Sequence, residues 1–352
     1  MPGAADSADN PAAGTPLPVD TFLQQIVNGV TLGSVYAIVA LGYTMVYGII
    51  QLINFAHGEV VMFGAMVAYS VIVALVGAGT ALPPLAILAI ATLTAIPACM
   101  VIGYLLERVA YRPLRRAPRL APLITAIGLS IVLQNVALII WSRNPLPYPQ
   151  IVATVPYHLT STQNGATITN VQIAIIGLSL AMMGGLVFLI YRTKLGVAMR
   201  AVAQNPQVAG LMGIDIDKVI SVTFTIGAAL AAVAGVMDGS YYGIAHYQMG
   251  FLLGLKAFSA AVLGGIGNIA GAMLGGMLMG IIEALGAGYV GEFTNLCALS
   301  HWSDALAQRC AGDPHLELFG SNYQDVFAFV VLILVLVFRP SGLLGERVAD
   351  RA

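Results

Sequence analysis

The residues of this sequence best suited to chemistry lie in one polar string inside apolar sequence, INFAHGE, which contains Asn54, His57 and Glu59. An ionised carboxylate at the centre of a bilayer costs at least about 2.5–3.5 kcal/mol, so such a group usually faces a bundle interior or water. The adjacent Gly58 permits a broken helix whose free backbone groups can line a cavity. The alternative is that His57 and Glu59 lie at a cytoplasmic interface near a turn.

Other polar residues interrupt the apolar sequence singly or in pairs. Gln134 and Asn135 fall within one apolar run. The simpler interpretation is that they form hydrogen bonds to a neighbouring helix, and the alternative is that they contact a substrate. Glu283, near the end of a Gly-rich stretch, is another polar candidate, and the alternative is a position at the interface without a functional role. Asp238 and Lys256 flank an expected external region, and we expect water around both.

No pattern indicates catalysis. The chain has no phosphate-binding GxxxxGK[ST], and the glycines of GGIGNIAG are wrongly spaced for a dinucleotide loop. One His and one Glu are too few for zinc, which needs three or four ligands. We therefore expect no ATP hydrolysis by this chain, no other enzyme activity, and no metal or cofactor.

Composition indicates an all-α polytopic membrane protein. Hydrophobic residues make up 59% of the 352 residues and charged residues only 9%, against roughly 25% charged residues in soluble domains. The length suffices for about eight spans of ~20 residues. A net charge of −1 offers no basic footprint for nucleic acid. The expected spans lie near 22–48, 60–78, 84–106, 121–141, 171–191, 219–240 and 325–338.

The apolar stretch 251–285 is too long for one upright span. It carries two small-residue blocks, AVLGGIGNIAG and AMLGGMLMG, so we expect a pair of half-helices there. Glycines four residues apart let helix backbones approach closely in a membrane. Such spacings join Gly235 to Gly239, and Gly267 to Gly271 and Gly275, with Gly276 and Gly280 following.

Cations predict the orientation, because cytoplasmic loops collect Lys and Arg. Five arginines fall between Arg108 and Arg119. If 107–120, 192–218 and the C-terminus are cytoplasmic, twelve of the 15 Lys and Arg residues lie on that side, the exceptions being Arg143, Lys256 and Arg309. The loops 142–170 and 287–324 are then external.

The two ends of the chain are expected to be short extensions. Residues 1–20 contain no Lys or Arg, whereas a signal peptide begins with a positively charged region. We therefore interpret them as a disordered leader. The C-terminal tail, 346–352, is cytoplasmic. The side of the N-terminus stays open: it is external if INFAHGE is a cytoplasmic turn, and internal if 49–78 is broken and re-entrant.

The loop 192–218 is expected to fold. Asn205 and Pro206 form a good N-cap and first helical residue. Val208, Leu211 and Met212 then share one helix face. Gly210 and Gly213 leave room for close approach or a helix end, and Asp215 and Asp217 can cap the next span. Docking against a partner protein, or a helix lying on lipid headgroups, would explain such a loop.

One of the three cysteines lies in apolar sequence and the other two lie in a polar loop. Cys99 lies in an apolar run and is expected to be buried. Cys297 and Cys310 lie in the long polar loop 287–324. Since disulfides persist on the oxidising side of a membrane, we predict a disulfide between them.

Five motifs in order resemble one known family: INFAHGEVVMFGAMVA, TKLGVAMRAVAQNPQVAGLMGI, FTIGAALAAVAGVM, KAFSAAVLGGIGNIAGAMLGGMLMGIIEAL and DVFAFVVLILVLVFRPSGLLG. Together they are similar to the LivH-like inner-membrane permeases of high-affinity branched-chain amino acid ABC transporters. The resemblance covers about residues 20–286 and 322–345 and implies a permease domain over 21–345. The sequence departs from the family's pattern in two places. Its leader is longer than usual, and the outer loop 287–324 resembles an insertion.

The resemblance implies partners and roles. A LivM-like second permease, two ATP-binding subunits and a periplasmic amino-acid-binding protein are expected, in a bacterial inner membrane. Residues expected to couple to an ATP-binding subunit are Arg200, Asn205, Pro206, Gly210, Leu211, Met212 and Gly213. Residues expected along the substrate path are Asn54, His57, Glu59, Gln134, Asn135, Gly265 and Gly267.

Two other functions remain possible from the sequence. Urea and short-amide importers share these motifs. A proton-coupled secondary transporter could use His57 and Glu59 as a relay, although the capped helix near 205–213 would then have no role.

Overall fold

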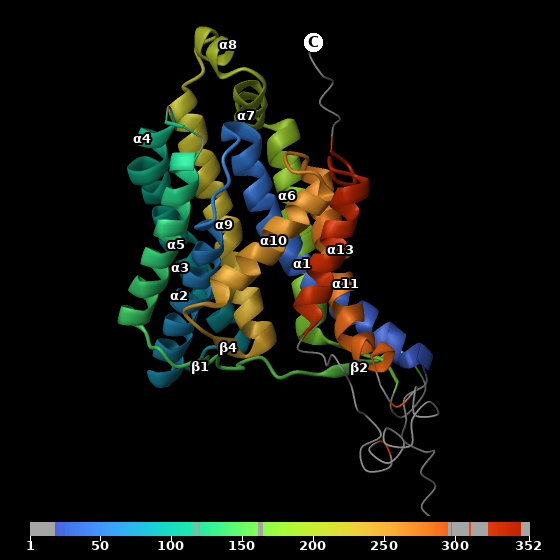
Figure 1. Ribbon diagram of the computed structural model, residues 1–352. Helices are drawn as coiled ribbons and strands as arrows, with labels where there is room; N and C mark the ends of the chain where they lie inside the picture. Colours follow the sequence, from blue (N-terminus) through green and yellow to red (C-terminus); the bar gives the residue numbers. More distant parts are fainter. Residues whose placement is uncertain are drawn as a thin grey trace, which may run out of the picture.

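The computed structural model of the protein is a bundle of long helices that run between two opposite ends (Figure 1). It describes residues 18–115, 117–118, 120–160, 165–294, 297, 310 and 323–345. Within these residues, seven helices are long and apolar enough to cross a membrane, and two shorter apolar helices accompany them. The all-α polytopic fold expected from the sequence is confirmed, with about the expected number of spans.

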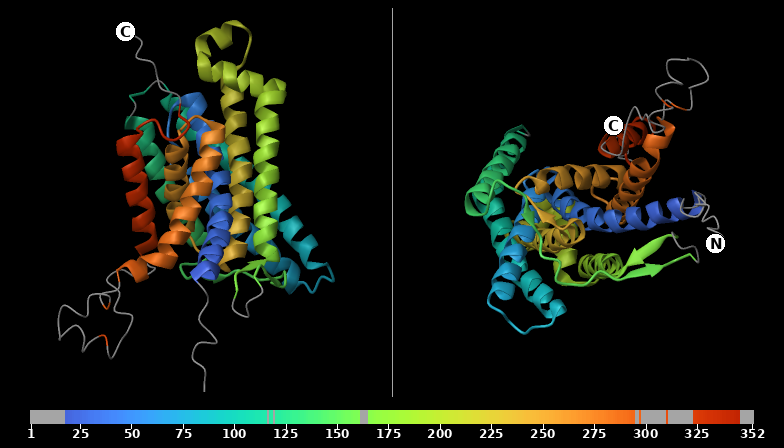
Figure 2. Two further views of the ribbon diagram at one scale, coloured as in Figure 1. Left: turned by 90° about the vertical axis from the view of Figure 1, so that its right-hand side faces the viewer. Right: turned by 90° about the horizontal axis from the view of Figure 1, so that it is seen from below.

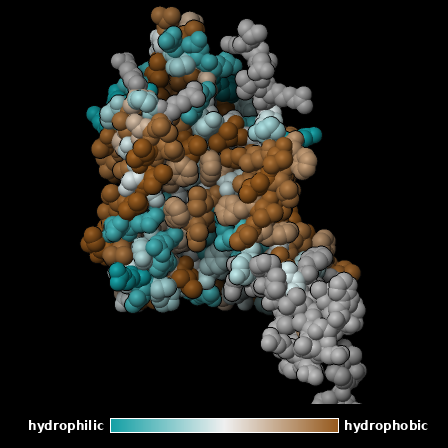
Figure 3. All heavy atoms as spheres, viewed as in Figure 1, coloured by the Kyte–Doolittle hydropathy of each residue, from teal (hydrophilic) through white to brown (hydrophobic). Residues whose placement is uncertain are grey.

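The surface agrees with a membrane setting. Figure 3 shows an apolar band around the middle of the visible face, with polar residues gathered toward both ends. A helix in lipid satisfies its backbone hydrogen bonds internally, which is why apolar runs of this length fold as helices here.

The first helix, α1 (Pro18–Ile50), crosses the whole bundle and ends near the end that carries α7 and α8 (Figure 1). It begins inside the predicted leader 1–20, whose residues 1–17 lie outside the described part. Residues 51–56 then run back into the bundle without helical structure, and α2 (His57–Gly77) starts inside it. The segment 49–78 is therefore broken, as one of the two sequence alternatives required. That alternative placed the N-terminus at the cytoplasmic end, whereas α1 starts at the end opposite α7 and α8.

The next two spans form the flank of the bundle. Helix α3 (Pro84–Leu105) continues into a π-helical turn (Leu106–Tyr111) and a short α4 (Arg112–Leu114). Helix α5 (Leu120–Ile140) returns to the other end. The π-helical turn matters for the site, because it carries Glu107 and Tyr111 into the protein interior.

Short strands tie the connections together at the end opposite α7 and α8 (Figure 1). Strand β1 (Leu146–Pro147) pairs antiparallel with β4 (Ile244–Ala245), and β2 (Pro156–His158) pairs antiparallel with β3 (Thr167–Thr169). The β1–β4 pair joins the chain leaving α5 to the chain entering α10. No strand was expected from the sequence.

The central part of the chain forms two long helices and the folded loop between them. Helix α6 (Asn170–Arg192) leads to α7 (Lys194–Gln204) and α8 (Pro206–Leu211), which project beyond the bundle, and α9 (Ile216–Tyr242) returns through it. Figure 2 shows the projection of α7 and α8 from a second direction.

The C-terminal part contains α10 (Met249–Gly264), α11 (Ile269–Phe293) and α13 (Gln324–Phe338). We expected two half-helices here, and only α10 is short enough to be one. Helix α11 contains a 23-residue apolar segment that is long enough to cross a membrane. Its last residues reach into the predicted outer insertion 287–324, most of which lies outside the described residues, as does the tail 346–352. Helix α13 ends at the same end as α7 and α8 (Figure 1).

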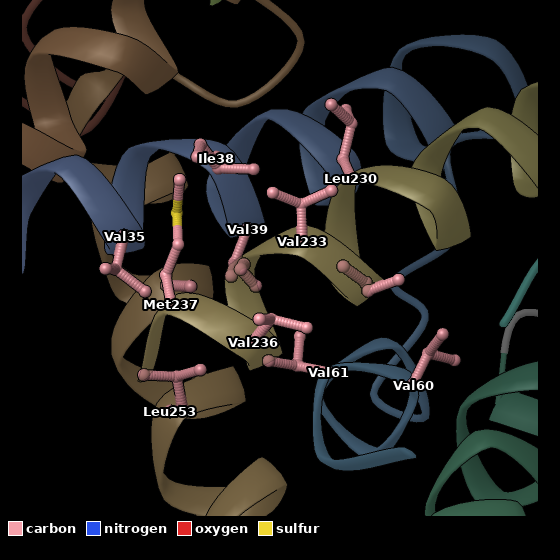
Figure 4. Close-up of a cluster of buried hydrophobic side chains, with 14 of the residues drawn as sticks. Val35, Ile38, Val39, Val60, Val61, Leu230, Val233, Val236, Met237 and Leu253 are labelled. Carbon is pink, nitrogen blue, oxygen red and sulfur yellow. The ribbon is translucent and has the colours of Figure 1, made fainter. Parts of the chain in front are cut away.

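The core surrounds α1 and α9, which are the most buried spans. Figure 4 shows side chains of α1, α2, α9 and α10 meeting there, among them Val35, Val61, Val233 and Leu253. Viewed from below in Figure 2, α1 lies between α11 on one side and α6 on the other.

Glycines allow the close helix packing that their spacing predicted. A Cβ on Gly235 would lie 2.0 Å from the Val61 carbonyl oxygen, and one on Gly280 would lie 2.1 Å from the Gly33 nitrogen. Gly267 is different from the rest of its series. It has φ +94°, and no described atom lies within 4 Å of its hypothetical Cβ, so its role is to shape the turn after α10.

Candidate functional site

Glu59 lies in the third helical position of α2 and is fully buried. Its Oε1 accepts a hydrogen bond of 2.8 Å from Ser130 Oγ and another of 2.8 Å from Gln134 Nε2, both on α5. A carboxylate in the first turn is also stabilised by the positive end of the helix dipole. The interfacial alternative for Glu59 is therefore wrong, because the break in the chain carries this residue into the bundle.

The other two residues of the polar string are also buried. Asn54 Oδ1 accepts a hydrogen bond of 2.8 Å from the hydroxyl of Tyr111, which fixes the extended segment against the π-helical turn. The ring of His57 packs edge-on to Tyr43, with 4.9 Å between ring centroids, in space left by the missing side chain of Gly42. His57 Nε2 has no hydrogen-bond partner among the described residues.

A cleft of about 610 Å³ lies beside this cluster, between α5 and α10. Its polar lining is Ser130, Gln134 and Gln248. Its apolar lining consists of aromatic and branched side chains, namely Phe55, Ile127, Ile131, Phe251, Leu252 and Leu255. A volume of this order with few polar groups is typical of sites for small molecules.

Not all residues predicted for the path meet here. Asn135, next to Gln134, is exposed and donates to the Ile131 carbonyl of its own helix. Gly265 and Gly267 lie in the turn after α10. That turn contacts the C-terminal segment 341–345, where Leu344 N donates to the Gly264 carbonyl at 3.0 Å. Neither glycine lines the cleft.

The loop predicted to couple to a partner has the expected local structure. Asn205 Oδ1 accepts a hydrogen bond of 3.1 Å from Val208 N, and Pro206 occupies the first position of α8. Gly213, with φ +84°, follows the end of the helix. Leu211 is 87% exposed and Met212 79% exposed, so the projecting end of the loop presents apolar side chains. Gly210 is also exposed in α8.

Arg200 holds the loop to the bundle. Its guanidinium donates to the Ile190 carbonyl near the end of α6 and lies 5.3 Å from the ring centroid of Tyr191. Asp215 caps α9 as expected, accepting from Lys218 N at 3.1 Å. Arg200 thus joins α7 to the end of α6, and Asp215 fixes the start of α9.

Sequence reasoning missed a buried ionic cluster among α1, α10, α11 and α13. Lys256 Nζ lies 2.7 Å from Glu283 Oε1 and 2.8 Å from Asp325 Oδ1. The hydroxyl of Tyr36 donates to Glu283 Oε2 at 2.9 Å. Lys256 and Asp238 were expected in water, and an interface was one alternative for Glu283; instead Glu283 is fully buried, Asp238 is buried, and the Lys256 side chain is 11% exposed.

The arginine cluster also makes specific pairs. Arg115 contacts both Asp217 and the buried Glu107, and Arg112 contacts Asp217. The pairs with Asp217 attach α4 and the residue after it to the start of α9. Asp217 therefore serves as an ion-pair partner, while Asp215 alone caps the helix. Arg116 and Arg119 lie outside the described residues.

The sulfur atoms of Cys297 and Cys310 are bonded in the structure, with 5.6 Å between their Cα atoms. Cys99 is buried and free. No group of three or more metal-ligating side chains occurs within the described ranges.

A family model described as the branched-chain amino acid transport system permease component matches residues 25–336. The chain belongs to this family. The match covers both the broken segment with Glu59 and the α7–α8 loop, so these features lie within the family's own domain. No solved structure matches the chain.

Several named proteins of this family are similar to the chain. The high-affinity branched-chain amino acid transport system permease protein BraD of Pseudomonas aeruginosa is 46% identical over 325 residues, covering 92% of this chain and 96% of BraD. The corresponding protein LivH of Escherichia coli K12 is 44% identical over 326 residues, with the same coverage. A probable branched-chain amino acid transport permease protein of Methanocaldococcus jannaschii is 26% identical, covering 88% of each chain.

Proposed function

We propose that this chain is a permease subunit of an ABC importer that passes branched-chain amino acids across a bacterial inner membrane. The observation that carries this proposal is the match over nearly the whole length to BraD and LivH, both named as high-affinity branched-chain amino acid permeases. The placement of 192–218 and the C-terminal end of α13 at one end of the bundle agrees with a cytoplasmic C-terminus. The bias of Lys and Arg toward that end supports the same orientation.

The substrate path is proposed along the cleft beside Glu59. The break at 51–56 brings polar groups into the bundle beside this cleft, and α2 and α10 both begin near it. The cleft lies between α5 and α10. A LivM-like second permease packed across this face would close it into a path shared between the two subunits.

The energy input is proposed to arrive through α7 and α8. Two ATP-binding subunits would dock at this end, with the exposed Leu211 and Met212 seated in one of them. Closure of the ATPase pair would then push α6 and α9 through Arg200 and the capped start of α9, rocking the spans between inward-open and outward-open states. A periplasmic amino-acid-binding protein would deliver cargo at the opposite end.

The test is reconstitution of the complete transporter in proteoliposomes. Leucine uptake should require ATP, both permeases, both ATP-binding subunits and the loaded binding protein. Uptake by this chain alone, driven by a proton gradient, would contradict the proposal.

A Glu59→Gln variant separates the ABC mechanism from proton coupling. With ATP held constant, leucine uptake should not depend on a proton gradient, either in the variant or in the wild type. Uptake in the wild type that collapses with an uncoupler at constant ATP would favour a secondary transporter.

A further inference from the structure

One hydrogen bond holds the segment 51–56, which separates α1 from α2, to a distant part of the chain. The hydroxyl of Tyr111 donates to Asn54 Oδ1 at 2.8 Å, and both residues are buried. Among the described residues, no other hydrogen bond joins 51–56 to an element beyond α1 and α2. Losing such a bond is costly, because a buried acceptor is left without a donor. The position of the segment therefore depends on Tyr111.

The segment also has room to move. Its first residue, Gln51, has φ +52°, which is uncommon for a residue with a side chain. Backbone strain of this kind persists where the surrounding structure imposes it, and it is frequent in switch regions. A cavity of about 380 Å³ is lined by Gln51 and Leu52 together with Val202 of α7 and Pro206 of α8. This cavity leaves space between the segment and the projecting loop.

The position of Asn54 affects the cleft between α5 and α10. Its neighbour Phe55 lines that cleft, and the ring centroid of Phe55 lies 5.6 Å from that of Phe258 on α10. Helix α2 starts three residues after Asn54 and carries Glu59 in its first turn. The Tyr111 hydroxyl thus positions one wall of the cleft, although Tyr111 is not among the residues that line it.

The π-helical turn that carries Tyr111 is also tied to the start of α9. Glu107, four residues before Tyr111, is fully buried. Its carboxylate accepts from Arg115 and from Ser221 Oγ on α9. Arg115 Nη1 lies 2.6 Å from Asp217 Oδ1, in the first turn of α9 directly after the α7–α8 loop. Single π-helical turns of this kind are frequent at functional sites. This one contacts α9 at one end and the broken segment at the other.

Resting on the proposed function, we propose that Tyr111 is a positioning residue that couples the α7–α8 loop to the cleft. Movement of the loop shifts the start of α9 and, through the ion pairs of Arg115, the π-helical turn. Tyr111 carries this shift to Asn54, and the cleft wall moves with it. Tyr111 acts without touching the substrate. ATP hydrolysis by the partner subunits then changes the cleft only while the bond between Tyr111 and Asn54 is intact.

The test compares leucine import with ATP hydrolysis in the complete transporter, reconstituted in proteoliposomes with the loaded binding protein. Tyr111→Phe removes only the hydroxyl and should lower the leucine imported per ATP hydrolysed about tenfold, the order of effect of one buried hydrogen bond. ATP hydrolysis itself should stay close to the wild-type rate, because the docking loop is unchanged. A purely structural role would lower import and hydrolysis together, by reducing the amount of folded transporter, and would leave their ratio unchanged.

Tyr104→Phe is the matched control. It removes the same hydroxyl from α3, but Tyr104 is 37% exposed and its hydroxyl accepts from the exposed Arg108. This variant should import as much leucine per ATP as the wild type. A loss of import per ATP as large in Tyr104→Phe as in Tyr111→Phe would overturn the proposal.

Double variants test whether these residues act through one connection. Asn54→Leu removes the acceptor at similar volume and should lower import per ATP as Tyr111→Phe does. Glu107→Gln removes the charge paired with Arg115 and should also lower it. Combining either substitution with Tyr111→Phe should cause no further loss, because residues that act through one connection are not additive. Effects that multiply in these double variants contradict the coupling role.

The outcomes separate this proposal from the function on which it rests. Suppose that the wild type needs ATP and the binding protein, and that Tyr111→Phe imports as much leucine per ATP. The positioning role is then wrong and the proposed function stands. If the wild type shows no ATP-dependent import with every subunit present, the proposed function is contradicted, and this proposal with it.

Discussion

Lys256 on α10 and Glu283 on α11 form an ion pair of 2.7 Å inside the bundle, and Asp325 at the start of α13 lies 2.8 Å from the same ammonium group. Three helices that the sequence presents as separate apolar runs are thus joined by one cation. A buried ion pair adds little compared with apolar packing, but breaking it leaves a charge without a partner.

We therefore predict that Lys256→Met destabilises the protein by about 3–5 kcal/mol, because the buried Glu283 loses its counter-charge. Thermal unfolding of the purified protein in detergent measures the change. The double variant with Glu283→Gln should recover part of the loss, since the unpaired charge is removed as well. Equal stability of Lys256→Met and the wild type would show that the pair contributes nothing.

The apolar end of the α7–α8 loop leads to a second prediction. Leu211→Asp or Met212→Asp should leave folding and insertion intact, because both side chains are almost fully exposed. Binding of the ATP-binding subunits should weaken, and ATP hydrolysis should no longer support uptake. Co-purification and paired uptake and ATPase assays measure both effects. Gln207→Asp, an exposed polar position of the same helix, serves as the control.

Glycine packing provides a third prediction. Gly280→Ala places a methyl group 2.1 Å from the backbone nitrogen of Gly33, so α1 and α11 must separate. Overpacking of this kind costs about 1–3 kcal/mol. In contrast, Gly184→Ala on α6 meets no atom within 4 Å and should be neutral or stabilising by up to about 1 kcal/mol. Unfolding curves of the two variants that move in the same direction would contradict this account.

The disulfide between Cys297 and Cys310 is the subject of a fourth prediction. Protein isolated without reductant and denatured in an alkylating reagent should gain one label, on Cys99, and three labels after reduction. Mass spectrometry counts the labels directly. Three labels without reduction would show that the two cysteines are thiols in the cell.

Much of the fold follows from local sequence. Runs of ~20 apolar residues cannot leave their backbone groups unpaired in lipid, so they must be helices, and the runs at 121–141 and 171–191 match α5 and α6 closely. The start of α8 was equally local, because an asparagine followed by proline satisfies a helix N-terminus whatever surrounds it.

The contacts between helices did not follow from the sequence. Helix α5 is apolar over most of its surface, so only a few small or polar residues, such as Ser130 and Gln134 one turn apart, mark the face that lies in the protein. Gln134 and Asn135 are neighbours in sequence, yet only Gln134 reaches Glu59. The rotation of α5 about its axis decides this, and that rotation is set by packing against α2 and the π-helical turn.

The sequence by itself determined that this chain spans a membrane and that the loop between α6 and α9 folds into a capped helix, because lipid exposure and helix capping act on short segments. Only the tertiary structure decided that Glu59 meets Ser130 and Gln134, and that Lys256 meets Glu283 and Asp325. Such pairs form between helices distant in sequence, and their partners are chosen by helix rotation and depth, which apolar sequence leaves free.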